Sequence, residues 1–321
     1  AVGFVVIGRN EGERLQRCLR ALHPTKHRVV YADSASTDGS TARARALGAE
    51  VVELDEDLPL TAARGRMAGL ERLRQLDPGL RYVHFIDGDC ILQPGWLDQA
   101  RTFLEAHPDV AAVCGRRFEA SPTSSPYNQL IDEEWNTPVG EAQACGGDAL
   151  MRIEALAQVG GFSTDLRAGE EPELCARLRQ AGWRIWRLDG RMTEHDAGIT
   201  RLGQWWKRAL RSGYGYAQVR ERTKSLPQPL YGDTLKRVIF WAAAVPLVWV
   251  AAALLTGRAM VLLGLPLTYA AQVARLAFKK GPTRSLSWLY ATLMVLTKFA
   301  ELAGAIRYWR RSESKRLTSY R

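Results

Sequence analysis

The stretch Tyr82-Val83-His84-Phe85-Ile86-Asp87-Gly88-Asp89-Cys90 guides the interpretation of the whole chain. Its first residues are mostly β-branched or aromatic, which is typical of a buried strand. Two acids follow, and ionised carboxylates at the end of a buried strand need compensation. A divalent cation with oxygen ligands is the simplest candidate, and the intervening glycine would let a ligand approach the backbone. Asp-Gly is also common turn chemistry, so this stretch alone leaves a solvated turn open.

Strand-like and helical patterns alternate along the first half of the chain. Strands are predicted at residues 3–7, 28–31, 50–53, 82–86 and 110–114. The intervening helices have apolar residues at helical spacing, with Asn10 as a plausible cap of the first and Thr61 of the third. This alternation predicts an α/β fold, with a mostly parallel sheet covered by helices on both faces.

Polar residues follow three of the predicted strands directly. They are Arg9-Asn10-Glu11, Asp33, and the acids Asp87 and Asp89. Because ligands of such sheets bind at the carboxyl ends of the strands, three polar clusters on one edge predict a binding site rather than three unrelated turns.

Composition narrows the class of protein. The 321 residues are 46% hydrophobic, which suits one large domain or two modest ones with a sizeable core. The cysteines contain no CxxC pair, so neither a zinc knuckle nor a disulfide framework is expected, and a reducing compartment fits best. The first residues resemble a strand rather than a signal peptide, so no signal peptide is expected.

Four motifs then occur in a fixed order: Val5-Val6-Ile7-Gly8-Arg9-Asn10-Glu11, Val30-Tyr31-Ala32-Asp33-Ser34-Ala35-Ser36-Thr37-Asp38-Gly39-Ser40, Arg66-Met67-Ala68-Gly69 and Asp87-Gly88-Asp89. As an ordered set they resemble the family 2 inverting glycosyltransferases, which have the GT-A fold. Met67 stands where that family usually has asparagine, which puts one nucleotide contact in doubt. The resemblance covers roughly residues 2 to 215.

The resemblance implies a set of nucleotide-sugar-binding residues in the first half: Asn10, Glu11, Asp33, Arg66, Asp87 and Gly88. Glu11 and Asp33 would contact the base or ribose, and Arg66 the nucleotide, with Arg64 as a nearby competitor. Asp87 would lie near the ribose or sugar. Asp89 would hold a divalent metal, Mn²⁺ or Mg²⁺, and Asp87 is a further candidate ligand.

Residues 116–145 are predicted to be an irregular loop that crosses the open edge of the site. Within it, Glu133-Glu134-Trp135 is interpreted as a solvated acidic patch. The loop leads into Cys145-Gly146-Gly147-Asp148, which resembles the family's glycine pair. By that resemblance Gly146 and Gly147 line the pocket of the donor sugar.

A second acidic stretch, Gly169-Glu170-Glu171-Pro172-Glu173-Leu174, predicts the start of a helix with Pro172 at its first position. Glu171 would lie at the mouth of this helix, where the dipole favours the ionised form that a general base needs. The stretch resembles the family's Glu-Asp-x-Asp-Leu motif, which makes Glu171 the base. Glu170 remains a competitor because glutamate is one methylene longer than aspartate.

Further candidates follow this helix. His195 comes after the strand predicted at residues 183–188 and resembles the third metal ligand of this fold. Gln204-Trp205-Trp206-Lys207-Arg208 matches the Gln-x-x-Arg-Trp motif of processive synthases only imperfectly, so processivity is not inferred. Arg208, together with Lys207 and Arg211, would contact the diphosphate or an anionic lipid head; a membrane-facing amphipathic helix is equally open.

The last third of the chain is predicted to be a membrane region. Residues about 238–256 and 259–277 are apolar, separated by Gly257-Arg258, and long enough to form a membrane hairpin. A third segment, about 285–306, contains Lys298 and Glu301 and would span the bilayer or lie in its interface. Basic clusters flank all three segments: Arg220, Arg222, Lys224, Lys236, Arg237, Arg275, Lys279, Lys280, Arg284, Arg307, Arg310, Arg311, Lys315 and Arg316. A hairpin with one interfacial helix keeps every cluster on the cytoplasmic side.

We therefore expect a catalytic domain at residues 1–225 and a membrane region at residues 226–321. The expected activity is metal-dependent inverting transfer of a sugar from a UDP- or GDP-linked donor to a lipid-linked or polysaccharide acceptor. The expected place is the cytoplasmic face of the inner membrane. The net charge of +10 is not attributed to nucleic acid, because the basic clusters flank apolar segments and lack an aromatic platform.

Two other functions remain open at this point. A nucleotidyltransferase also uses paired acids at a sheet edge, but the glycine-rich phosphate loop that usually follows its first strand is absent here. A non-catalytic, membrane-tethered module that binds nucleotide-sugar would show the same motifs without turnover.

Overall fold

The computed structural model describes residues 1–23 and 26–318, with side chains up to residue 311. It divides into two compact units: residues 1–124 with 131–198, and residues 125–130 with the chain from Ile199 onward. This division reflects which residues pack together. Our predicted boundary at residue 225 concerns a different point, where the membrane region begins, and it stays a prediction. Lys315 and Arg316 of the last basic cluster lie outside the described side chains.

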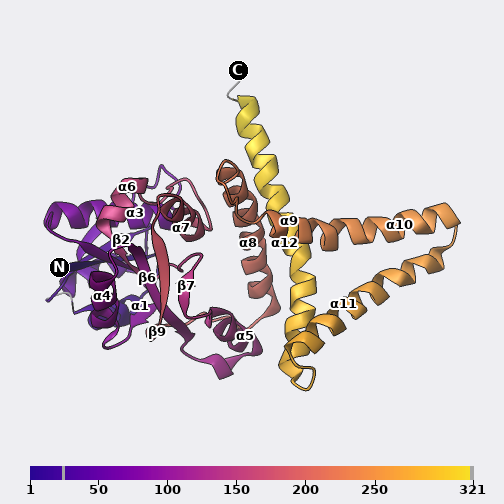
Figure 1. Cartoon of the computed structure of the whole chain (residues 1–321), viewed down its shortest axis with the longest axis horizontal. Coiled ribbons are helices and arrows are strands. Elements are labelled where there is room, and N and C mark those ends of the chain that lie inside the picture. Colours follow the sequence, from indigo (N-terminus) through magenta and orange to yellow (C-terminus); the bar gives the residue numbers. More distant parts are fainter. Residues whose placement is uncertain (24–25, 319–321) are drawn as a thin grey trace. The chain divides into compact units, whose positions relative to one another are not determined.

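The first unit is a mixed α/β structure around one sheet (Figure 1). Its strands are β1 Val2–Gly8, β2 Arg28–Asp33, β3 Glu50–Glu53, β4 Tyr82–Asp87, β5 Cys90–Leu92, β6 Val110–Glu119, β7 Gly140–Ala142, β8 Ala149–Arg152 and β9 Arg184–His195. The order is β3-β2-β1-β4-β8-β6-β9-β5, with β7 also paired to β9. The neighbouring strands β3, β2, β1 and β4 are parallel, as predicted. Strands β8, β5 and β7 pair antiparallel with their neighbours, so the sheet is mixed.

Helices connect these strands. In the first unit they are α1 Glu13–Leu22, α2 Ser40–Ala46, α3 Ala62–Leu76, α4 Trp96–Ala106, α6 Ile153–Val159 and α7 Glu170–Gln180, with a short 3₁₀ turn, η1, at Pro122–Ser124. Helix α5, Pro126–Trp135, begins in the second unit and ends in the first. The predicted cap of α3 is confirmed, because the Thr61 hydroxyl accepts a bond from the Arg64 amide at 3.2 Å.

Alternate residues of β1 pack on opposite faces of the sheet, as the period of a strand requires. On one face α3 approaches closely: a Cβ atom at Gly65 would lie 3.2 Å from Ile7, and Gly69 lies directly against Val5. On the other face Phe4 contacts His84, whose ring accepts a bond from the Trp96 indole of α4 at 3.0 Å. Helices therefore cover both faces, and the mostly buried strands β1, β2, β4 and β8 form the centre of the core.

The region predicted to be an irregular loop, residues 116–145, is largely regular. Strand β6 continues five residues beyond the predicted end, from Cys114 to Glu119, and η1, α5 and β7 follow. The physical reason is side-chain pairing: Arg116 is held by Asp132 of α5 at 2.7 Å, so polar residues continue a strand that apolar patterning alone would end. Strand β9 likewise extends to His195 rather than ending at residue 188.

The second unit is helical. Its elements are α8 Leu202–Arg222, α9 Gly232–Ile239, the π-helical segment η2 Phe240–Ala244, α10 Val245–Thr256, the 3₁₀ segment η3 Ala259–Leu263, α11 Gly264–Lys280 and α12 Ser285–Thr318. Three stretches are long and apolar enough to cross a membrane: Gly232–Thr256, Ala259–Lys280 and Ser285–Arg311. Helices α10 and α11 meet at a tip around residue 257, as in the predicted hairpin (Figure 1).

Polar groups inside this apolar region have local partners. The Trp249 indole donates to the Thr268 hydroxyl at 3.1 Å, and the Tyr269 hydroxyl donates to the carbonyl of Trp241 in η2 at 2.6 Å. In the third stretch Lys298 and Glu301 pair at 2.7 Å, which lowers the cost of placing either charge among apolar side chains.

Candidate active site

The register of the parallel strands brings the predicted polar clusters to one edge. Gly8 pairs with Asp33, and Ile7 pairs with Asp87, so β1, β2 and β4 end side by side. Gly88 then packs on the end of β1: its amide donates to the Ile7 carbonyl at 2.7 Å, and a Cβ atom there would lie 3.1 Å from that oxygen. The glycine between the two acids thus allows close contact between backbones.

Asp33 organises the turn after β2. Its buried carboxylate accepts a bond from the Tyr31 hydroxyl at 2.7 Å and another from the Ser36 amide at 2.7 Å. The acid therefore shapes the turn that the sequence resemblance assigns to the nucleotide, and its own contact with base or ribose stays a prediction.

Asn10 does not cap α1, contrary to the prediction from sequence. Its backbone is left-handed, with a φ of 56°, and its side-chain oxygen accepts a bond from the Thr37 amide at 2.7 Å. The N-cap position is Gly12, which makes no side-chain cap. Asn10 instead ties the loop after β1 to the turn after β2, because its side chain is turned toward that neighbouring loop.

Glu11 lies beside the two acids of the central motif. It forms an ion pair with Arg14 at 2.8 Å, and a Cβ atom on Gly88 would approach its Cγ at 3.4 Å. Burial raises the pKa of Glu11, and the negative charge of Asp89 raises it further. Glu11 therefore belongs to the same electrostatic cluster as Asp89.

Two arginines share the carboxylate of Asp87. Nη2 of Arg66 lies 3.0 Å from Oδ1, and Nη2 of Arg117 lies 2.9 Å from Oδ2. The Asp87 amide also donates to Asp148 Oδ1 at 3.0 Å. Both oxygens of Asp87 are thus engaged by guanidinium groups, which makes it a poorer candidate metal ligand than Asp89.

Arg117 and Asp148 were not predicted as site residues. Asp148 is buried and accepts bonds from Arg117 Nε at 3.0 Å and from the Thr193 hydroxyl at 2.7 Å. Burial favours the neutral acid, but Arg117, the Thr193 hydroxyl and the Asp87 amide together outweigh it and hold the pKa of Asp148 below its usual range. The one available signal was the position of Asp148 directly after the Gly146-Gly147 pair.

Asp89 and His195 form the pair that suits a cation. Nε2 of His195 lies 3.2 Å from Asp89 Oδ2, and Cys90 Sγ lies in the same group of candidate ligand atoms. Nδ1 of His195 is buried and has no hydrogen-bond partner among the described residues, so no hydrogen bond at this nitrogen fixes the orientation of the ring. A carboxylate oxygen next to an imidazole nitrogen fits a divalent metal.

A second group of candidate ligand atoms consists of Asp87, Cys90 and Asp148. Arg117 contacts all three, with its Nη2 3.1 Å from Cys90 Sγ. A guanidinium therefore already supplies positive charge to this group, so the Asp89–His195 pair is the better-placed group to hold a cation.

The candidate base lies at the start of α7. Gly169, with a φ of 81°, precedes the helix, which begins at Glu170, so Pro172 is its third residue rather than its first. Arg66 contacts both Glu170, at 2.8 Å, and Glu171, at 3.1 Å. Burial raises the pKa of Glu171 to about 7, and the charge of Glu170 contributes.

The remaining predicted residues lie in different surroundings. Gly147 adjoins Arg66, since a Cβ atom there would lie 2.5 Å from Nη2, whereas Gly146 has open space around it. Arg208 lies on α8 in the second unit, where its guanidinium stacks on Trp205 at 5.6 Å, and its nucleotide contact stays a prediction. Trp135, interpreted as part of a solvated patch, packs its ring edge against His195 at 4.9 Å.

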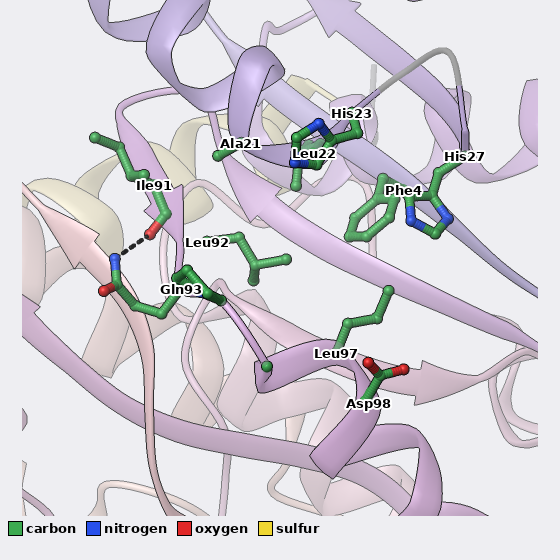
Figure 2. Close-up of a pocket in the computed structure, with 12 residues that line it drawn as sticks. Phe4, Ala21, Leu22, His23, His27, Ile91, Leu92, Gln93, Leu97 and Asp98 are labelled. Atoms are coloured by element: carbon green, nitrogen blue, oxygen red, sulfur yellow. Dashed lines mark hydrogen bonds between the residues drawn. The ribbon is translucent and has the colours of Figure 1, made fainter.

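A cavity of about 560 Å³ in the first unit is separate from this cluster (Figure 2). It lies between the end of α1, β5 and the start of α4, and it is lined by Phe4, Leu22, His23, His27, Leu92 and Asp98 among others. Its lining contains none of the predicted site residues, so the candidate site is defined by the sheet edge and not by this cavity.

Comparisons with known proteins agree with this geometry. Residues 4–156 match the family described as Glycosyl transferase family 2. The succinoglycan biosynthesis protein ExoA of Rhizobium meliloti (strain 1021) is 27% identical over 311 residues, covering 86% of this chain and 92% of that protein. The pre-mycofactocin glycosyltransferase of Mycobacterium tuberculosis (strain ATCC 25618 / H37Rv) is 27% identical over 193 residues, covering 55% of this chain and 41% of that protein.

A solved structure shares the fold. The mannosyltransferase PcManGT from Pyrobaculum calidifontis, in complex with GDP-Man and Mn²⁺, superimposes with a TM-score of 0.62 over 96% of this chain and 86% of its own, at 18% identity. At that identity the likeness concerns the fold alone. Taken with the family match, it shows that this chain carries a Glycosyl transferase family 2 domain of the GT-A fold and is a glycosyltransferase.

Proposed function

We propose that this glycosyltransferase is metal-dependent and inverting, and that it transfers a sugar from a nucleotide-sugar to a hydroxyl of a lipid-linked or glycan acceptor. The observation that carries the proposal is the placement of a partly buried carboxylate, Glu171, beside the donor-side acid Asp87, with Arg66 touching both. A base close to the donor end of the site is what direct displacement requires.

Glu171 takes the proton from the acceptor hydroxyl in this proposal. The attacking oxygen then approaches the anomeric carbon from the face opposite the nucleotide, which inverts the configuration. A carboxylate whose pKa is raised to about 7 suits this role, because a base works best with a pKa near the operating pH. Holding the reactants in line supplies a further part of the acceleration.

Asp89 and His195 are the residues that would hold the metal, Mn²⁺ or Mg²⁺. When bound, a divalent cation offsets the charge that develops on the departing nucleotide diphosphate. Asn10, Glu11 and Asp33 shape the part of the edge assigned to base and ribose, and they act by orienting the nucleotide.

The acceptor is proposed from the membrane region and from the relatives. Three stretches long and apolar enough to span a bilayer follow the catalytic unit in the chain. The relative ExoA is named for succinoglycan biosynthesis. We therefore place the catalytic unit on the cytoplasmic side of the inner membrane, with the membrane region at residues 226–321 delivering or retaining a lipid-linked acceptor.

Nucleotide release by the purified full chain, in detergent or lipid, tests the proposal. A panel of UDP- and GDP-sugars is supplied with Mn²⁺, Mg²⁺ or chelator, and GDP-mannose with Mn²⁺ is included because the structurally similar PcManGT was solved with both. Glu171→Gln serves as the matched variant, since it keeps the shape of the side chain and removes its charge.

We expect release with at least one donor, dependent on metal, and a loss of at least about 100-fold in kcat for Glu171→Gln, the usual size of a general-base contribution. Release that survives this substitution undiminished would contradict the assignment of the base. Binding of metal and nucleotide with no transfer to any lipid or glycan acceptor would favour the non-catalytic binding module. Nucleotidyl transfer is not supported, because the family match identifies a glycosyltransferase.

A further inference from the structure

Arg66 lies on α3 at the centre of a cluster of carboxylates that come from β4 and α7. Its Nη1 donates to Glu170 Oε1 at 2.8 Å, and its Nη2 lies 3.0 Å from Asp87 Oδ1 and 3.1 Å from Glu171 Oε1. Only 3% of the side chain is exposed. Both terminal nitrogens are therefore bonded to carboxylates of the protein, and Nε is buried with no hydrogen-bond partner in the described part of the chain.

The surroundings of this guanidinium leave it little freedom. Gly147 adjoins it on one side, where even a Cβ atom would lie 2.5 Å from Nη2. The ring of Phe162 covers it on another, with the Arg66 Cζ 5.5 Å from the ring centroid. To reach a ligand, the guanidinium would have to break its contacts with these carboxylates, and separating it from the buried Glu170 is costly because both charges are shielded from water.

We infer that Arg66 is a positioning residue for the base, which holds Glu171 and Glu170 against Asp87 instead of contacting the nucleotide. The inference rests on the proposed function, because it assumes that Glu171 is the base. Arginine suits the task because its planar fork of donors can bind several carboxylates in a fixed geometry, which the single ammonium group of lysine cannot do. The Arg66 side chain thereby holds both Asp87, on the donor side, and the base Glu171.

The charges around Glu171 determine which pH dependence the positioning role of Arg66 would produce. The titratable or charged groups that act on it are Arg66 from α3, Asp87 from β4, Glu170 and Cys175 from α7, and Cys145 from the loop before β8. Burial raises the pKa of Glu171, Glu170 raises it further, and Arg66 opposes both. Removal of Arg66 would therefore leave more of the base protonated at neutral pH.

The first experiment compares Arg66→Met with the parent, using the donor identified by nucleotide release. We expect the acidic limb of the kcat–pH profile to move upward by about one pH unit, the usual effect of removing a close opposite charge. We expect the affinity for the nucleoside diphosphate, measured by calorimetry, to change less than about threefold. Arg72→Met is the control, since Arg72 also lies on α3 and pairs with Glu50 at 2.7 Å, away from the cluster.

Two further variants keep the test valid if Arg66→Met does not fold. Glu170→Gln retains the arginine and removes the charge that raises the pKa of Glu171, so the acidic limb should move downward. Arg66→Lys keeps the charge but loses the fork, so kcat should fall while the limb stays within a few tenths of a pH unit. In the double variant Arg66→Met/Glu170→Gln, the limb should return toward that of the parent.

Failure of this inference is distinguishable from failure of the proposed function. If the parent transfers no sugar, or if Glu171→Gln is fully active, the proposed function itself is wrong. If the parent behaves as proposed but the Arg66 variants lose nucleoside diphosphate affinity tenfold or more with an unmoved limb, Arg66 is a nucleotide contact and the inference is overturned. An unmoved limb in Glu170→Gln would also overturn it.

Discussion

At Asp87, two guanidinium groups share a single carboxylate, one on each oxygen. Arg117 approaches from β6 and also contacts the buried Asp148 at 2.9 Å. Asp87 and Asp148 therefore each have a cationic partner within the protein. Asp89 lies beyond Gly88 and pairs with His195 at 3.2 Å.

A residue-scale prediction follows for Arg117. Arg117→Met leaves the buried Asp148 without its cation, and breaking a buried pair in this way costs about 3 kcal/mol or more. For a unit of this size we expect the melting temperature in detergent to fall by roughly 6–12 °C. The measurement is thermal unfolding followed by circular dichroism.

The neighbouring Arg116→Met is the matched control. Arg116 pairs with Asp132 at 2.7 Å, but their side chains are 20% and 26% exposed, so water can replace the lost partner. We expect a smaller change in melting temperature for this variant. Equal destabilisation by the two substitutions would contradict the role given to the buried pair.

At the scale of elements, two helices of the second unit pack through glycine. Gly213 of α8 lies directly against the Glu301 carbonyl of α12, and Gly304 of α12 lies directly against the Leu210 carbonyl of α8. A Cβ atom at either position would overlap the backbone of the other helix. Small residues that allow such close approach are typical of helix pairs in membranes.

Alanine substitutions test this packing with opposite expectations. In an exposed helix, alanine is favoured over glycine by up to about 1 kcal/mol. Gly203→Ala, on α8 with nothing within 4 Å of the added Cβ, should therefore be neutral or stabilising. Gly213→Ala and Gly304→Ala should lower the melting temperature of the detergent-solubilised chain, because α8 and α12 must separate.

Melting curves that place all three glycine variants at or above the parent would show that α8 and α12 do not pack closely in the protein. The comparison is informative because each substitution adds the same single carbon atom. Only the surroundings of that atom differ among the three positions.

At the scale of the whole molecule, the membrane topology is open to a direct test. Our proposal places the hairpin tip at Arg258 across the membrane from the loop at Thr283. All five native cysteines are buried, so a single engineered cysteine can be labelled selectively. In sealed inner-membrane vesicles with the cytoplasmic side outward, an impermeant maleimide should label Thr283→Cys and not Arg258→Cys.

The topology of the third apolar stretch can be tested in the same vesicles. Its helix α12 contains the Lys298–Glu301 pair, and it is more buried within the second unit than the first two stretches are. If it lies in the interface, as the basic clusters favour, a tag placed after residue 321 will be digested by protease added outside these vesicles. Protection of that tag would show that the third stretch spans the bilayer.

Local patterns in the sequence predicted much of the fold. The alternation of apolar runs and helical spacing predicted β1 to β4 and their helices, because a strand buried between helix layers must be apolar throughout. The same reasoning predicted that β6 ends at Cys114 and that residues 116–145 are irregular. The prediction failed there because Arg116 and Arg117 pair with acids that are distant in sequence. The pattern of apolar residues does not indicate such pairs.

For the site, the sequence alone predicted that Asp33 and Asp87 meet at one sheet edge, because parallel strands share their carboxyl ends. The role of Glu171 as the base stays a prediction from the motif. The charge pairs among the site residues become visible in the folded chain alone. Arg66 reaches Glu170 across 104 positions of the chain, and Arg117 reaches Asp87 across 30. Charge pairing depends on distances in space, and spacing along the chain does not encode those distances.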